Sequence, residues 1–116
     1  MESYVEQGKV FLPKYIGDNE IYLWRDINYE RETKTLIFIY QLLNLNMDII
    51  EEDNINISKI IEENKVNMLN NWEDDNQDII ILKNMNLIIE YIHYDINNME
   101  LFRQKMLYNT PLEFIN

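Results

Sequence analysis

The sequence of 116 residues contains no cysteine, no alanine, two glycines and two prolines. Without cysteine, the chain cannot form a disulfide, use a thiol nucleophile or bind a metal through thiolates. Both glycines and one proline lie within residues 1–17, and neither a repeat nor a Pro/Gly/Ser-rich linker interrupts the rest. Because this length is typical of one domain, we expect residues 1–116 to form a single globular domain.

Basic residues are also scarce, with 10 Lys and Arg against 21 Asp and Glu, a net charge of −11. This balance argues against direct binding to nucleic acid, which requires Lys and Arg at the phosphates. The 19 isoleucines and 17 asparagines indicate an AT-rich genome, such as that of a low-GC bacterium, a phage or a large DNA virus. Such a genome should also enrich lysine, but only seven lysines are present, so we interpret the acidity as selected.

Long hydrophobic runs are missing as well. The longest uninterrupted apolar run, residues 36–40, has five residues, whereas a membrane-spanning helix needs about 18. The first residues have neither the basic nor the apolar region of a signal peptide. We therefore expect no membrane partner and a cytoplasmic location, in a bacterial cell or an infected host cell.

The spacing of apolar residues predicts a mainly α fold, a compact bundle of about four helices with an N-terminal β-hairpin. The hairpin is predicted where residues 10–12 and 21–24 flank the turn-forming residues 17–20. A short helix over residues 19–27 is the competing interpretation of this segment. With 47% hydrophobic residues, the chain has enough apolar side chains to form a core.

The four helices are predicted over residues 30–45, 57–72 and 81–96, and from residue 97 up to the stop at Pro111. The last begins at Asn97 with Glu100 three residues later, which resembles a capping box. Abundant β-branched isoleucine weakens helix propensity. Residues 36–40 and 78–82 are therefore alternative strands, and an α+β fold is the alternative prediction.

The negative charge is concentrated in residues 51–78, where nine acidic and two basic residues give a net charge of −7. The acids also have an explanation that involves no partner. Carboxylates that precede a helix can simply cap its N-terminus, and a run of charges can simply be a solvated face. Trp72 adjoins the last cluster, where it is either a partner-binding anchor or a core residue. The predicted partner-binding residues are Glu51, Glu52, Asp53, Glu62, Glu63, Trp72, Glu73, Asp74, Asp75 and Asp78.

A concentrated negative field attracts basic proteins, including nucleases and other proteins with nucleic-acid-binding clefts. The leading hypothesis is therefore a non-enzymatic inhibitor that neutralises a basic protein partner. In its commonest form it would be a bacterial immunity protein against a nuclease toxin, or a phage anti-defence protein. We predict no cofactor and no metal site, because the sole histidine, His93, has no paired ligand motif.

Two other hypotheses remain open. Residues 23–25 and 72–73, together with the size, acidity and isoleucine-rich helices, loosely resemble the short Bcl-2-like inhibitors of poxviruses. The resemblance implies a viral antagonist of host signalling that binds an amphipathic helix in an apolar groove. The third hypothesis is a small enzyme that uses acids near His93, such as Glu90 one helical turn away.

Overall fold

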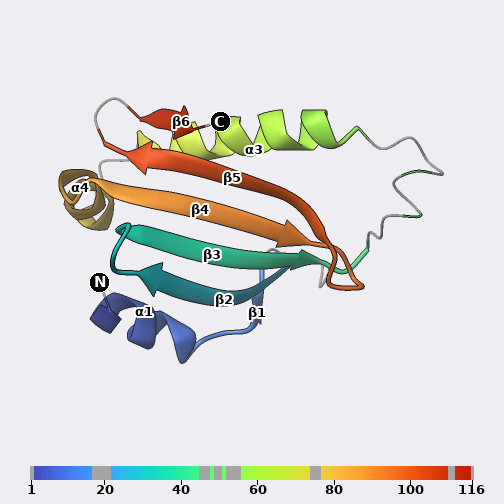
Figure 1. Cartoon of the computed structure of the whole chain (residues 1–116), viewed down its shortest axis with the longest axis horizontal. Helices are drawn as coiled ribbons and strands as arrows, with labels where there is room; N and C mark the ends of the chain where they lie inside the picture. The colour runs from blue at the N-terminus through green and yellow to red at the C-terminus, as the bar shows by residue number, and fades with distance from the viewer. Residues whose placement is uncertain are drawn as a thin grey trace.

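The computed structural model describes residues 2–16, 22–44, 48, 51, 56–73, 77–109 and 112–115. It shows an α+β fold in which helices pack on one six-stranded sheet (Figure 1). The helices are α1 (Glu2–Lys9), α3 (Ile57–Trp72) and α4 (Gln77–Asn84). The strands are β1 (Lys14–Tyr15), β2 (Tyr22–Glu30), β3 (Thr35–Leu42), β4 (Leu87–Tyr94), β5 (Glu100–Tyr108) and β6 (Glu113–Ile115).

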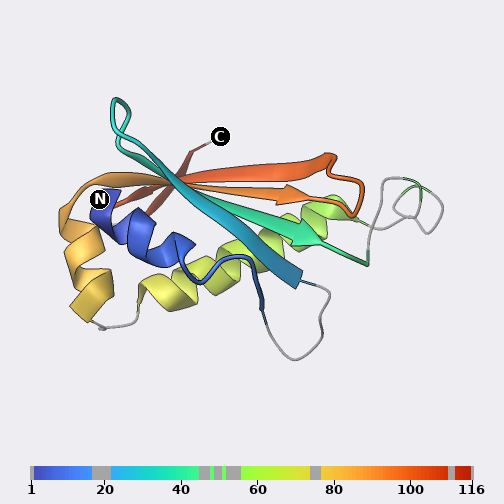
Figure 2. The same cartoon turned by 90° about the horizontal axis from the view of Figure 1, so that it is seen from below.

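The strands follow one another across the sheet in the order of the sequence. All neighbours are antiparallel except β3 and β4, which form a parallel pair at the centre. A parallel pair needs a crossover connection, and α3 and α4 lie in that connection. Figure 2 shows α1, α3 and α4 on the same face of the sheet. No helix in the described ranges covers the other face, which we call the open face.

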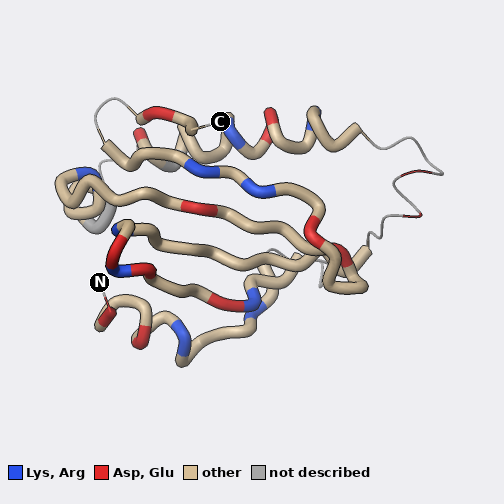
Figure 3. The backbone as a smooth tube through the Cα atoms, in the orientation of Figure 1, with Lys and Arg blue, Asp and Glu red and all other residues tan. Residues whose placement is uncertain are grey.

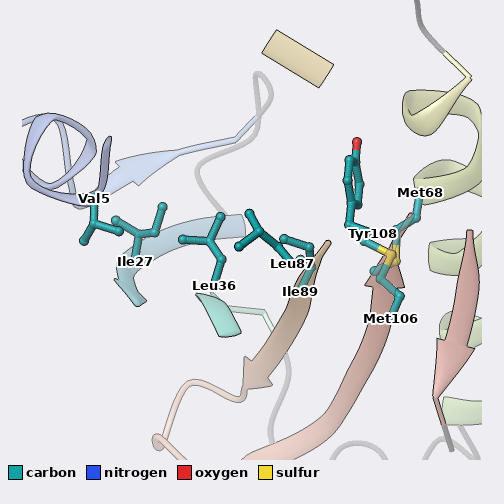
Figure 4. Packing of buried hydrophobic residues seen from close by; sticks show 8 residues of the cluster. All are labelled: Val5, Ile27, Leu36, Met68, Leu87, Ile89, Met106 and Tyr108. Atoms are coloured by element: carbon teal, nitrogen blue, oxygen red, sulfur yellow. The ribbon is translucent and has the colours of Figure 1, made fainter. Parts of the chain in front are cut away.

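The core lies between the helices and the covered face of the sheet. Figure 4 shows its side chains in a row that runs from α1 across β2, β3, β4 and β5 to α3. The strand residues of this row alternate with residues of the open face, as the two-residue period of a strand requires. The buried core residues are Val5, Ile27, Leu36, Met68, Leu87, Ile89, Met106 and Tyr108.

The predicted mainly helical bundle is wrong. Residues 30–45, expected to be helical, contain the end of β2, a turn and β3. Residues 81–96 contain the end of α4 and then β4, separated by Asn86 in the left-handed conformation (φ 52°). Several isoleucines of these strands lie on the open face, so both faces of the central strands are apolar and the two-residue alternation is weak in the sequence.

The predicted capping box at Asn97 is also wrong. Residues 95–99 form the turn between β4 and β5, where Asn98 takes a left-handed conformation (φ 66°). Asp95 Oδ1 accepts hydrogen bonds from the backbone N–H groups of Asn97 and Met99, both at 2.8 Å. Asp95 therefore stabilises a strand turn at the point where a helix start was expected.

Two other predicted elements compare better with the structure. The helix over residues 57–72 coincides with α3. At the N-terminus the chain does reverse into an antiparallel pair, but Lys14 of β1 pairs with Trp24, whereas residues 10–12 follow the unpredicted helix α1. The expected turn residues, 17–20, lie outside the described residues. Among the described helices, none is both long and apolar enough to cross a membrane.

A substitution of Ile27 tests the assignment of the core. Ile27 is fully buried between α1 and the sheet, beside Val5. We expect Ile27→Ala to lower the free energy of unfolding by about 2–5 kcal/mol, since it removes buried methylene groups and leaves a cavity. Ile81→Ala is the matched control, because Ile81 is 50% exposed on α4 and its truncation should cost about 0.5 kcal/mol or less. Urea denaturation measures both, and equal losses would contradict the assigned core.

Candidate functional site

A ladder of aromatic rings crosses the covered face at the end of the sheet where β2 begins. Tyr40 is the centre of this ring ladder, with its ring 5.2 Å from both Tyr22 and His93 and 5.9 Å from Tyr91. His93 in turn stacks on Phe102 at 4.3 Å. The rings come from β2, β3, β4 and β5, where strand pairing places them directly or diagonally opposite one another.

His93 lies inside the ring ladder, with only 2% of its surface exposed. Its Nε2 is 2.9 Å from the Tyr22 hydroxyl, and its Nδ1 has no hydrogen-bond partner among the described residues. Burial lowers the pKa of His93 to about 4, because an imidazolium loses its hydration there. The imidazole is therefore neutral at pH 7. Burial also raises the pKa of Tyr22, Tyr40 and Tyr91, so their hydroxyl groups remain protonated.

A pocket of about 500 Å³ separates the ring ladder from α3. Tyr22, Tyr40, Tyr91 and His93 form its sheet side. Its helix side consists of Met68 and the carboxamides of Asn64, Asn67 and Asn70, and Ile16 adds to the rim. Among the described residues that line the pocket, none is charged at pH 7, in a chain with a net charge of −11. We call this cavity the ladder pocket.

The acids near His93 have other roles. Glu90 precedes His93 by three residues in a strand, so the two side chains point to opposite faces of the sheet. On the open face the buried Glu90 carboxylate accepts a hydrogen bond from Arg103 Nη1 at 2.8 Å and lies 3.7 Å from Lys105 Nζ. The expected contact between Glu90 and His93 in one helical turn is therefore wrong. The described ranges contain no group of three or more His, Asp and Glu residues that could hold a metal ion.

The predicted acidic residues divide into those that the structure places and those that it does not. Glu51, Glu62, Glu63 and Glu73 are exposed. Glu52, Asp53, Asp74 and Asp75 lie outside the described residues, as does the side chain of Asp78 in α4. Charged residues of both signs also lie elsewhere on the chain (Figure 3). Glu62 and Glu63 lie on α3, and Glu73 directly follows its last residue, Trp72.

These acids flank exposed apolar side chains. Glu62, Val66 and Leu69 are spaced by four and three residues, so they lie along one side of α3. Glu73 continues this row just beyond the helix, where its N–H donates a hydrogen bond to the Leu69 carbonyl at 3.0 Å. Val66 is 55% and Leu69 is 38% exposed. We call this row, with Glu63 beside it, the outer stripe of α3. It faces away from Met68, the α3 residue buried in the core.

Trp72 has a different position from the acids that follow it. It is half-buried and packs against the hydrophobic core. Lys83 Nζ of α4 lies 4.1 Å from the centre of the Trp72 ring, a cation–π contact that covers one ring face. These contacts agree with the interpretation of Trp72 as a core residue. Its role as a partner-binding anchor remains a prediction.

No protein-family model and no curated protein sequence matches this chain. The structure is similar to the crystal structure of a candidate secreted protein from Pseudomonas aeruginosa, with a TM-score of 0.62 and 16% sequence identity. The match covers 90% of this chain and 82% of that protein. This similarity supports the fold alone.

His93 was singled out from the sequence in the enzyme hypothesis, but the other residues of the ladder pocket were not identified. The signal that could have found them is the spacing of two between aromatic residues, Phe38 and Tyr40 in one segment and Tyr91 and His93 in another. This spacing places both members of a pair on one face of a strand. A helical interpretation of the same segments separates them onto different sides.

The low pKa of His93 predicts that the protein becomes less stable in acid. Between pH 6.5 and about 4 the unfolded chain binds a proton on this imidazole that the folded chain does not, so the free energy of unfolding falls as the pH falls. The total loss is on the order of 3 kcal/mol. His93→Gln removes the titration, so the stability difference between wild type and variant should shrink across this range in urea denaturation.

Because His93 is the sole histidine, one imidazole signal in an NMR titration reports its pKa directly. We expect the signal to remain that of the neutral ring down to about pH 5. A midpoint near 6.5 would contradict the buried, neutral imidazole.

Proposed function

We propose that this chain is a non-enzymatic inhibitor that binds and neutralises a basic protein. An immunity protein against a nuclease toxin and a phage anti-defence protein are the two biological forms that this activity would take. The observation that carries the proposal is the outer stripe of α3, where two exposed apolar residues lie between exposed carboxylates. An apolar centre with a polar rim is the usual composition of a protein–protein contact.

The carboxylates of the outer stripe contribute little to the stability of α3. Asn56 caps the helix, since its Oδ1 accepts a hydrogen bond from the Lys59 N–H at 3.3 Å, and the first turn contains no acid. Glu62 lies 3.6 Å from Lys65, but its side chain is 72% exposed, and such exposed pairs contribute little stability. Helix capping therefore does not account for the carboxylates of the outer stripe. This supports the proposal that they contact a partner.

The charge of the chain favours a basic partner. With a net charge of −11, the molecule attracts positively charged surfaces over distances of about one Debye length, roughly 8–10 Å in physiological salt. Carboxylates at the rim of a contact mainly accelerate association, while apolar residues at its centre slow dissociation. The outer stripe offers both, because Glu62, Glu63 and Glu73 surround Val66 and Leu69.

The alternative of a viral antagonist with a helical groove loses its basis, because the chain is α+β and the resemblance required a helical bundle. We also propose the cytoplasm as the site of action, where a toxin or defence complex would meet its inhibitor. The similar Pseudomonas aeruginosa structure is of a candidate secreted protein, and at 16% identity it supports the fold and not the location.

The proposal predicts that carboxylates of the outer stripe control the association rate. A basic protein is first captured at low salt from cells that produce this chain, with the product of any adjacent toxin gene as the first candidate. We expect Glu62→Gln with Glu63→Gln to lower the association rate several-fold at low salt, and to reduce its salt dependence. Surface plasmon resonance at several salt concentrations measures both quantities.

Glu32→Gln with Glu113→Gln is the matched control, because it makes the same change in net charge at exposed positions outside α3. It should have the smaller effect. Equal effects of the two pairs would remove the assignment to the outer stripe. Binding that is unchanged from low to high salt would contradict the electrostatic inhibitor itself.

The apolar centre of the outer stripe gives a separate prediction. Val66→Ser with Leu69→Ser should accelerate dissociation about tenfold, because buried apolar contacts at the centre of an interface are lost. Val10→Ser with Ile81→Ser is the control, since both of these residues are exposed and lie outside α3. An unchanged dissociation rate in the first variant would show that the partner binds elsewhere.

A further inference from the structure

The geometry points to the ladder pocket as a binding site for a small uncharged ligand rich in hydroxyl groups, such as a neutral monosaccharide. This site lies beside the outer stripe of α3, because Asn67 and Asn70 lie four residues after Glu63 and Val66. The pocket is bounded by the ring ladder and by the side of α3 that carries three asparagines (Asn64, Asn67 and Asn70). Its volume of about 500 Å³ lies in the range of small-molecule sites.

The lining determines the charge of the ligand. Every described side chain that lines the ladder pocket is neutral at pH 7, including His93, whose burial disfavours the imidazolium. An ionic ligand would lose hydration on entry without gaining an opposite charge. A neutral ligand has no such penalty.

The stacking of the rings determines the shape of the ligand. Tyr40 is nearly parallel to Tyr91 and to His93, at interplanar angles of 17° and 20°, and His93 lies at 15° to Phe102. At centre distances of 4.3–5.9 Å parallel rings must overlap face to face with an offset. The faces of Tyr40, Tyr91 and His93 are thus partly used within the ladder, so a planar aromatic ligand has to compete with these contacts.

The hydrogen-bonding groups fit a polyol. Asn64, Asn67 and Asn70 are spaced by three residues along α3, and each carboxamide can both donate and accept hydrogen bonds. The Tyr40 and Tyr91 rings on the opposite wall also carry hydroxyl groups. A sugar hydroxyl likewise donates and accepts, so it can satisfy groups of either kind.

His93 lines the sheet side of the ladder pocket. Its Nδ1 is buried and has no partner among the described residues, but the atom is closed to solvent, so a ligand in the pocket does not reach it. The imidazole ring itself borders the pocket, so a bound ligand changes its surroundings and the imidazole signal reports binding.

The test titrates the protein separately with glucose, galactose and mannose, and follows the His93 imidazole signal and the asparagine carboxamide signals by NMR. Glucuronate tests a charged sugar and adenosine tests a planar ligand. We expect at least one neutral sugar to shift the His93 and Asn67 signals, and glucuronate and adenosine to bind about tenfold more weakly or not at all. The inference is overturned if no neutral sugar shifts these signals, or if adenosine or glucuronate binds as tightly.

Two variants locate the site. Asn67→Asp places a charge at an exposed position in the pocket wall and should weaken sugar binding about tenfold, whereas Asn84→Asp on α4 should not. Tyr40→Phe keeps the ring ladder but removes one hydroxyl and should also weaken binding, whereas Tyr94→Phe, on the open face, should not. Circular dichroism establishes that each variant is folded. Equal losses in a variant and its control would place the sugar outside the ladder pocket.

Discussion

The parallel pairing of β3 with β4 is the constraint on which the rest of the structure depends. Two parallel neighbours cannot be joined by a tight turn, so the chain must cross from one end of the sheet to the other between them. That crossover contains α3 and α4, which cover one face of the sheet together with α1. The antiparallel pairs outside the centre need no such coverage, and the open face follows from this arrangement.

The two faces of the sheet accommodate buried polar groups in different ways. On the covered face, hydrophobic residues continue into the ring ladder, where burial keeps His93 in a neutral state. On the open face, Glu90 is 5% exposed although no helix of the described chain lies above it. Its carboxylate is balanced by Arg103 and Lys105 of the neighbouring strand, since an unpaired buried charge would be costly.

Helix α3 connects the two proposals of function because it has distinct sides. Its buried side contributes Met68 to the core, and the asparagines form one wall of the ladder pocket. Its outer stripe combines acids with Val66 and Leu69, which would face a partner. The two surfaces adjoin, since Asn70 lies one helical turn after Val66, but they consist of different side chains.

The sequence by itself determined the net charge, the absence of thiol chemistry, helix α3 and the exposed acids at Glu62 and Glu63. These follow from composition and from local periodicity, which are properties of a short segment. Only the tertiary structure decided that residues 35–42 and 87–94 are strands, because Ile39 and Ile92 make the open face apolar and weaken the two-residue alternation that marks a strand. It alone assembled the ladder pocket, whose rings and asparagines come from distant segments and meet through strand pairing and helix packing.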